Sequence, residues 1–234
     1  MAYPSIAAGS SRPSGAPSSS QGDRVSQRIR TSWIDQYALR QDVGNPFVQV
    51  ITAAQQLALV ADDRTGLNRS EYDAVAAART QAGLLEDLAR WLDDEVGSHA
   101  QRSDNALKDK LGPEAQARVL AGALSGAVRC HSMLIDACHT LLQISERLLV
   151  VRRASSRLRL MAAVEAVRAA ASTAHLTVLV NLPRITDVAL YDELAHRIDS
   201  FDGTLARANR VAASLRSEAA VRHSMPHQNR SIVS

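Results

Sequence analysis

The 234-residue chain has few aromatic residues and little net charge. Two Trp, four Tyr and two Phe make up only 3% of it, so few side chains are available to stack on nucleic-acid bases. The net charge of +3 is too small to indicate binding to a phosphate backbone. Nucleic acid is therefore not an expected partner.

Long hydrophobic runs and closely placed cysteines are also missing. No run of 18 or more apolar residues occurs, and no basic segment followed by an apolar one opens the chain, so neither a membrane span nor secretion is predicted. Cys130 and Cys138 would lie about 12 Å apart along one helix, too far for a disulfide bond. Two free thiols are typical of a reducing compartment, which predicts a cytoplasmic location.

Alanine and leucine are abundant in a composition that is 46% hydrophobic. This favours helices over strands, and the length suffices for one core. We predict an all-α fold, a single helical bundle of about five or six helices between residues 23 and 222. Residues 1–22, rich in Ser, Pro and Gly, and residues 223–234 are predicted to be disordered tails.

The spacing of apolar residues places the individual helices. It predicts an amphipathic element from Val25 to Tyr37, a helix from Phe47 to about Val60, one from Ser70 through Val96, the longest from Glu114 to about Val151, and a last one whose heptad seam runs from Tyr191 to Leu215. Ser70 and Asp73 resemble a capping box. Thr186 or Asp187 is expected to cap the last helix, in which Gly203 would permit a break.

The longest apolar stretch, residues 160–194, organises this bundle. Alanines between positions 162 and 174 surround nearly the whole circumference of a helix, which predicts a member buried at the centre. Pro183 ends that helix and places Asn181 in its last turn. There the amide either caps the helix or, if buried, needs hydrogen-bond partners.

Several side chains could carry chemistry. His131 lies on the apolar stripe of the longest helix and is either a hydrogen-bonded core residue or a general acid or base. Asp93 and Glu95 crowd a helix end where carboxylates face the negative pole of the dipole, which fits a solvated charge run or a site. Asp136 and His139 alone are too few ligands, so no metal site is predicted.

Arginines gather between positions 147 and 159 with no acid among them. Such a cluster can clamp a carboxylate or phosphate, or it can simply complement the negative end of a helix. The residues are Arg147, Arg152, Arg153, Arg157 and Arg159.

The block from Ala162 to Asp187, above all AHLTVLVNLPRITD, resembles the C-terminal cyclodeaminase domain of formiminotransferase-cyclodeaminase and its bacterial methenyltetrahydrofolate cyclohydrolase relatives. The similarity continues nearly without gaps back to Ala127 and more loosely to Ile34. The resemblance implies an all-helical, dimeric fold that uses no metal. It also implies action on a folate, by loss of ammonia or by hydrolytic ring opening, with Asn181 and the pair Asp93 and Glu95 retained.

Other positions depart from the family pattern. A glycine-rich turn of the family is reduced here to Gly44 followed by Asn and Pro, so fewer backbone amides are exposed to an anion. Arg153 and Arg159 stand near the position of a family acid, which inverts the local charge. His131 replaces a proline. A folate cyclodeaminase activity is therefore not the expected function.

Two functions fit this pattern. The first is an enzyme without cofactor, a cyclase, lyase or hydrolase that performs cyclisation, hydrolysis or C–N bond chemistry on an anionic metabolite; a folate-like ligand is implied by the resemblance alone. In it, His131 or an acid of the pair Asp93 and Glu95 would act as general acid or base, and the substrate would bind to Arg153, Arg159, Asn181 and Gly44. The second is a non-catalytic dimeric module for ligand binding or interaction.

Overall fold

The computed structural model describes residues 44–224, and the side chains of residues 44–218. Helices fill most of this range, and no strand occurs within it, so the predicted all-α bundle is confirmed. The predicted tail 1–22 and the predicted element Val25–Tyr37 lie outside the described residues. The helices are α2 (Pro46–Ala61), α3 (Arg69–Lys108), α4 (Pro113–Arg147), α5 (Ala154–Asn181), α6 (Val188–Asp199) and α7 (Phe201–Ser224), with short 3₁₀ turns η1 (Leu148–Val150) and η2 (Leu182–Arg184).

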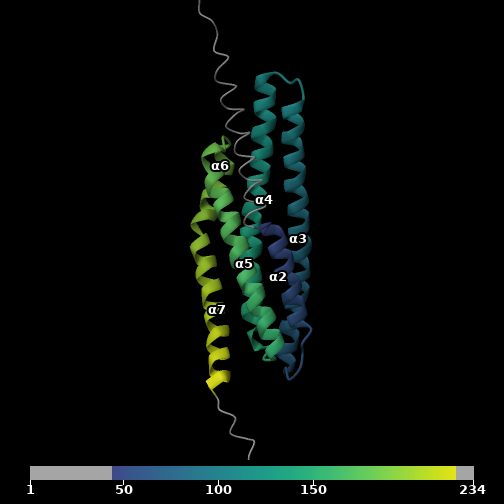
Figure 1. Ribbon diagram of the computed structural model, residues 1–234, viewed down its shortest axis with the longest axis vertical. Coiled ribbons are helices and arrows are strands. Elements are labelled where there is room, and N and C mark those ends of the chain that lie inside the picture. Colours follow the sequence, from purple (N-terminus) through teal and green to yellow (C-terminus); the bar gives the residue numbers. More distant parts are fainter. Residues whose placement is uncertain (1–43, 225–234) are drawn as a thin grey trace, which may run out of the picture.

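The helices run side by side along one long axis (Figure 1). α3 and α4 form an antiparallel hairpin whose tip extends beyond the other helices. The short helix α2 packs on α3 and on α5, and α5 also packs on α4 and α7. Helix α5 is thus the central member, as predicted, and α7 is the outermost one.

The core consists of aliphatic side chains from all of these helices. Small residues of α5, including Ala163, Ala170 and Ala174, are fully buried. They allow neighbouring helices to approach to about 8–10 Å between axes. His131 and Cys138 are both buried, as their place on the apolar stripe predicts.

Helix α3 begins and ends elsewhere than predicted. Its N-cap is Asn68, whose Oδ1 accepts from the Glu71 N–H at 3.0 Å while the Glu71 carboxylate accepts from the Asn68 N–H at 2.9 Å. The predicted capping box from Ser70 to Asp73 is therefore wrong, because this reciprocal pair satisfies the first turn two residues earlier. The helix also continues past Val96 to Lys108.

The predicted last helix is two helices. Asp187 caps α6, its Oδ1 accepting from the Leu190 N–H at 3.2 Å. The chain breaks at Ser200, before Phe201 opens α7, and Gly203 lies inside α7. At the other end of this region, Pro183 ends α5 as predicted, and a 3₁₀ turn follows.

One helical segment has the length and composition of a membrane span. Residues Ala154–Arg184 have a mean hydropathy of 1.2 over an 18-residue window, and 39% of that window is buried inside the bundle. A core helix has the same apolar composition, because its side chains must leave water on packing. The packing of α5 on α2, α4 and α7 accounts for the buried part of this composition.

Candidate functional site

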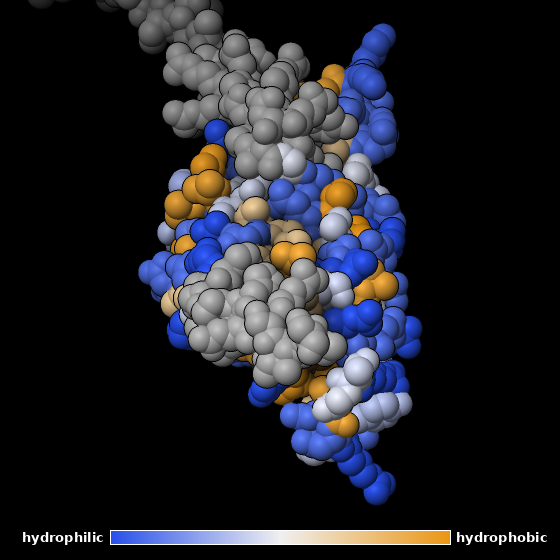
Figure 2. All heavy atoms as spheres, turned by 60° about the horizontal axis from the view of Figure 1, so that its bottom comes forward, coloured by the Kyte–Doolittle hydropathy of each residue, from blue (hydrophilic) through white to orange (hydrophobic). Residues whose placement is uncertain are grey.

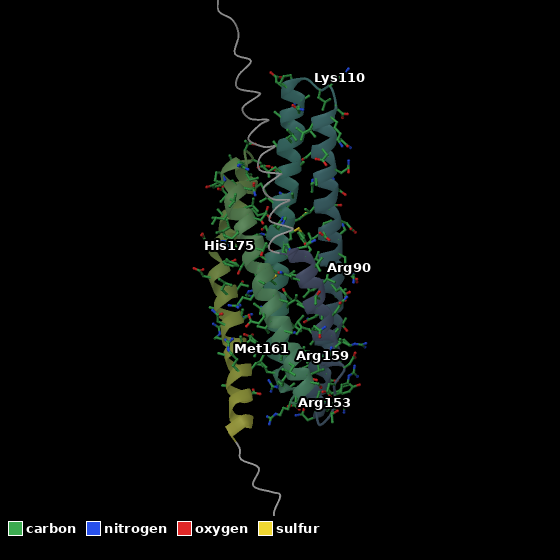
Figure 3. The ribbon with its side chains drawn as sticks, in the orientation of Figure 1. Arg90, Lys110, Arg153, Arg159, Met161 and His175 are labelled. Carbon is green, nitrogen blue, oxygen red and sulfur yellow. The ribbon has the colours of Figure 1, made fainter. Side chains whose placement is uncertain are left out.

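A cleft of about 320 Å³ opens between the end of α2 and the start of α5. Arg153 and Arg159 lie close together at this end of the bundle, far from Lys110 at the hairpin tip (Figure 3). Figure 2 turns this end toward the viewer and shows mostly hydrophilic side chains with separate hydrophobic patches. The cleft is lined by Leu59, Asp62, Asp63, Arg153, Ser155, Ser156 and Arg159.

One wall of the cleft is the N-terminus of α5. The N-cap residue Arg153 has an extended backbone and no side-chain capping bond, and the first turn contains no acid. The Arg157 N–H donates to the Arg153 carbonyl at 3.0 Å, so the amides of residues 154–156 have no acceptor within the helix. The positive pole of a 28-residue helix therefore faces this region with little compensation from its own sequence.

The two arginines of the cleft differ in their contacts. Arg159 Nη1 donates to Gln56 Oε1 at 3.0 Å. Within residues 44–218, the Arg153 guanidinium takes part in no hydrogen bond or ion pair, and it lies near enough to Asp63 to stabilise the charge of that carboxylate. Arg153 is thus the cation of the cleft that is available to a ligand.

The opposite wall carries two carboxylates at the end of α2. Asp63 Oδ2 accepts from Ser156 Oγ at 2.7 Å. This hydrogen bond lowers the pKa of Asp63, with further lowering from Thr65 and Arg153 and an opposing effect of burial. Asp62 Oδ1 pairs with Arg79 Nε at 2.9 Å. The lowered pKa keeps the Asp63 carboxylate charged at neutral pH.

His131 lies at the other end of α2 and is only 5% exposed. Its Nδ1 is 2.9 Å from the Ala127 carbonyl, and since a carbonyl only accepts, Nδ1 donates. The ring meets Phe47 edge to face, with centroids 5.0 Å apart. These contacts match the hydrogen-bonded core histidine that the sequence left open as one alternative.

Gly44 and Asp93 lie at that same end of α2. Asn45 caps α2 with its Oδ1, and its Nδ2 donates to Asp93 Oδ1 at 3.1 Å. Gly44 precedes it with φ of 83°, a conformation that favours glycine. Glu95 lies two residues after Asp93 on α3 and pairs with Arg102 at 4.0 Å.

The predicted site residues therefore occupy three places. The cleft brings together Arg153 and Arg159, and the start of α2 brings together Gly44, Asp93 and His131. The 16 residues of α2 separate these places by about 24 Å. Asn181 is fully buried at the far end of α5, where its Nδ2 donates to the Thr177 carbonyl at 2.8 Å.

Sequence reasoning identified only two of the seven residues that line the cleft, Arg153 and Arg159. The residues that it missed are Leu59, Asp62, Asp63, Ser155 and Ser156. A signal was present: an Asp pair directly after one apolar helix, and a Ser pair directly after the arginines that open another. Only the antiparallel packing of α2 on α5 places the two pairs together.

The two cysteines, and the pair Asp136 and His139, lie outside the cleft. Burial raises the pKa of Cys130 to about 11 and that of Cys138 further, so both are protonated at neutral pH and poor nucleophiles. Asp136 Oδ2 pairs with Arg197 at 2.5 Å, and His139 contacts Thr204 Oγ1 at 3.2 Å.

The fold is that of a cyclodeaminase-like helical bundle. The solved structure of formiminotetrahydrofolate cyclodeaminase from Thermotoga maritima is similar with a TM-score of 0.54 and 18% sequence identity, covering 75% of this chain and 89% of that chain. The family model described as formiminotransferase-cyclodeaminase matches residues 100–200. The predicted resemblance to the cyclodeaminase-like family is thus confirmed, and no curated protein matches the chain significantly.

The matched segment covers only part of the candidate residues. It contains His131, Arg153, Arg159 and Asn181, whereas the α2 wall of the cleft precedes it. The sequence match therefore supports the fold around these residues, and the function of the cleft must be argued from its own geometry.

Proposed function

We propose that this protein is a diverged member of the cyclodeaminase-like fold that binds a small metabolite through an anionic group in the cleft between α2 and α5. The observation that carries the proposal is the Arg153 guanidinium, which lines the cleft at the uncapped N-terminus of α5 and pairs with no carboxylate among the described residues. A guanidinium and free helix amides together form a favourable site for a carboxylate or phosphate.

Neighbouring groups complete the proposed anion site. Arg159 is held by Gln56 through one nitrogen, which leaves its other donors for a ligand. Ser155 is exposed on the same first turn and adds a hydroxyl. The volume of about 320 Å³ is at the small end of the range typical of metabolite sites.

If the protein is an enzyme, the bound metabolite is its substrate, and the reaction is cyclisation, hydrolysis or C–N bond cleavage. A small ligand held by Arg153 does not reach His131 or Asp93, which lie about 24 Å away at the other end of α2. We therefore assign binding to the cleft, while catalytic roles of His131, Asp93 and Glu95 stay predictions. The cytoplasmic location inferred from the two free thiols also stays a prediction.

Ligand binding tests the proposal directly. The full chain is titrated by calorimetry with pentanoate and with inorganic phosphate in a low-chloride buffer, alongside Arg153→Gln and Arg159→Gln. At least one anion should bind, and each variant should weaken it. Arg184→Gln, in the turn η2 that follows the far end of α5, is the matched control and should bind normally. Equal binding by Arg153→Gln and the unmodified chain would refute the anion site.

The second candidate is a non-catalytic dimeric module, which exposed apolar side chains favour. Leu176 on α5 is 58% exposed, Val180 is 60% exposed, and Val188 at the start of α6 is 73% exposed. Leu176 and Val180 lie one turn apart on the same face of α5, and exposed apolar residues grouped in this way are typical of a surface that a second subunit covers. Light scattering after gel filtration should show a dimer that Leu176→Asp with Val180→Asp converts to monomer. Leu158→Asp, on the opposite end of α5, should leave it unchanged.

The chemistry named for the Thermotoga relative needs its own test. Purified protein is incubated with 5-formiminotetrahydrofolate and separately with methenyltetrahydrofolate, and absorbance and ammonia release are followed. We expect no turnover. Turnover that is lost in Asp93→Asn or Glu95→Gln would show that the chemistry survives the arginine substitutions and that our functional assignment is wrong.

A further inference from the structure

The cleft has one positive and one negative wall. Arg153 and Arg159 lie on the α5 side, and Asp62 and Asp63 lie on the α2 side. Its lining therefore contains two guanidinium groups and two carboxylates, whose charges cancel in sum but not in space. A simple anion would use only one of these walls.

The helix dipoles reinforce this separation. The N-terminus of α5 adds partial positive charge to the arginine wall, and the C-terminus of α2 adds partial negative charge to the aspartate wall. Helix α2 has no basic residue in its last turn, and α5 has no acidic residue in its first. Each helix end thus lacks the charge that would neutralise it locally, and Asp62 and Asp63 add to the negative pole instead.

The aspartates retain capacity for a ligand. A carboxylate offers about four acceptor sites. The described residues occupy few of these sites: Asp62 accepts from Arg79, and Asp63 accepts from Ser156 and Thr65. The hydrogen bond from Ser156 keeps Asp63 in its charged form and fixes one of its oxygens on the α5 side. A cation between the walls would meet the ionised Asp63 carboxylate, held in place by Ser156, and the Asp62 carboxylate, held by Arg79.

Between the charged walls lies an apolar contact. Leu59 is 47% exposed and lines the cleft one turn before Asp62. A ligand that joins two charged groups by a short aliphatic part would place that part against Leu59 and remove apolar surface from water.

We infer that the cleft selects a zwitterion of amino-acid type, with its carboxylate toward Arg153 and the α5 N-terminus and its ammonium group toward Asp62 and Asp63. This inference rests on the proposed anion site and adds the second half of the ligand to it. The ligand class is therefore a small aliphatic amino acid rather than a plain carboxylate or a phosphate.

A matched set of probes tests the inference. Calorimetry with the full chain compares 2-aminopentanoate and 5-aminopentanoate, which carry both charges, with pentanoate, which lacks the ammonium group, and butylamine, which lacks the carboxylate. At least one amino acid should bind about fivefold more tightly than pentanoate, the upper range for an exposed ion pair. Butylamine should bind most weakly.

Variants separate the two walls. Asp63→Asn keeps an acceptor for Ser156, so it should weaken amino-acid binding about fivefold while leaving pentanoate binding unchanged or stronger. Arg153→Gln should weaken both. Asp73→Asn, an exposed position on α3, is the control, and thermal melting confirms that each variant is folded.

The outcomes distinguish the two proposals. Pentanoate binding as tight as that of both amino acids, insensitive to Asp63→Asn, would overturn the zwitterion and leave the anion site in place. Absence of binding by every probe, or binding of pentanoate that Arg153→Gln leaves unchanged, would overturn the anion site itself. Preference for an amino acid that depends on both Arg153 and Asp63 supports the inference.

Discussion

Gly126 on α4 provides a sharp test of how α3 packs on α4. A Cβ atom built there would lie 2.0 Å from His99 Cε1 and 2.2 Å from His99 Nε2, well inside contact distance. The imidazole therefore fills the space that a side chain at 126 would need. Gly122, one turn earlier on the same helix, has no neighbouring atom within 4 Å of the equivalent position.

The two glycines should respond oppositely to alanine. In a helix interior, Gly→Ala gains up to about 1 kcal/mol from backbone entropy, so Gly122→Ala should stabilise the protein by that amount. Gly126→Ala has the same entropic gain, but the new methyl group forces His99 out of its place, at a typical overpacking cost of about 1–3 kcal/mol. The two variants should differ by about 1–3 kcal/mol in the free energy of unfolding.

Urea denaturation followed by circular dichroism measures this difference, and thermal melting should show it as about 2–4 °C per kcal/mol. A double-mutant cycle with His99→Ala tests the cause. In the His99→Ala background, Gly126→Ala should stabilise the protein as much as Gly122→Ala does. If Gly126→Ala stabilises the unmodified chain as much as Gly122→Ala does, His99 has room to rotate and the packing argument fails.

Three further predictions concern protonation, thiols and a helix cap. Burial lowers the pKa of His99 and His175 below the ordinary 6.5, so both histidines take up protons when the protein unfolds. The free energy of unfolding, measured in urea melts, should therefore fall as the pH decreases from 7 to 5. Replacing both histidines by Gln should reduce this pH dependence. Cys130, with its pKa raised to about 11, should react with iodoacetamide at pH 8 only after unfolding, and rapid native labelling would contradict its burial. Asn68→Ala should cost about 0.5–2 kcal/mol in urea melts by removing the α3 cap, whereas Ser70→Ala, at the position predicted from sequence, should cost less.

Local rules anticipated those parts of the molecule that depend on neighbouring residues. Pro183 ends α5 because a proline has no N–H to continue the helical hydrogen bonds, although Leu182 before it keeps a helical conformation. Asp187 caps α6 because its side chain reaches an amide three residues on. The apolar stripe placed His131 and Cys138 in the core. Where two caps competed, the rule was not sufficient: Asn68 with Glu71 prevailed over Ser70 with Asp73.

The sequence by itself determined the helical class of this protein, its apolar faces and its likeness to cyclodeaminases, since composition, periodicity and motifs are properties of short stretches. The tertiary structure alone decided which functional groups meet. Ser156 and Asp63 are 93 positions apart and share a hydrogen bond of 2.7 Å. His131 and Arg153, only 22 positions apart, lie about 24 Å from each other, because the part of α4 from His131 to Arg147 forms a helix that separates them.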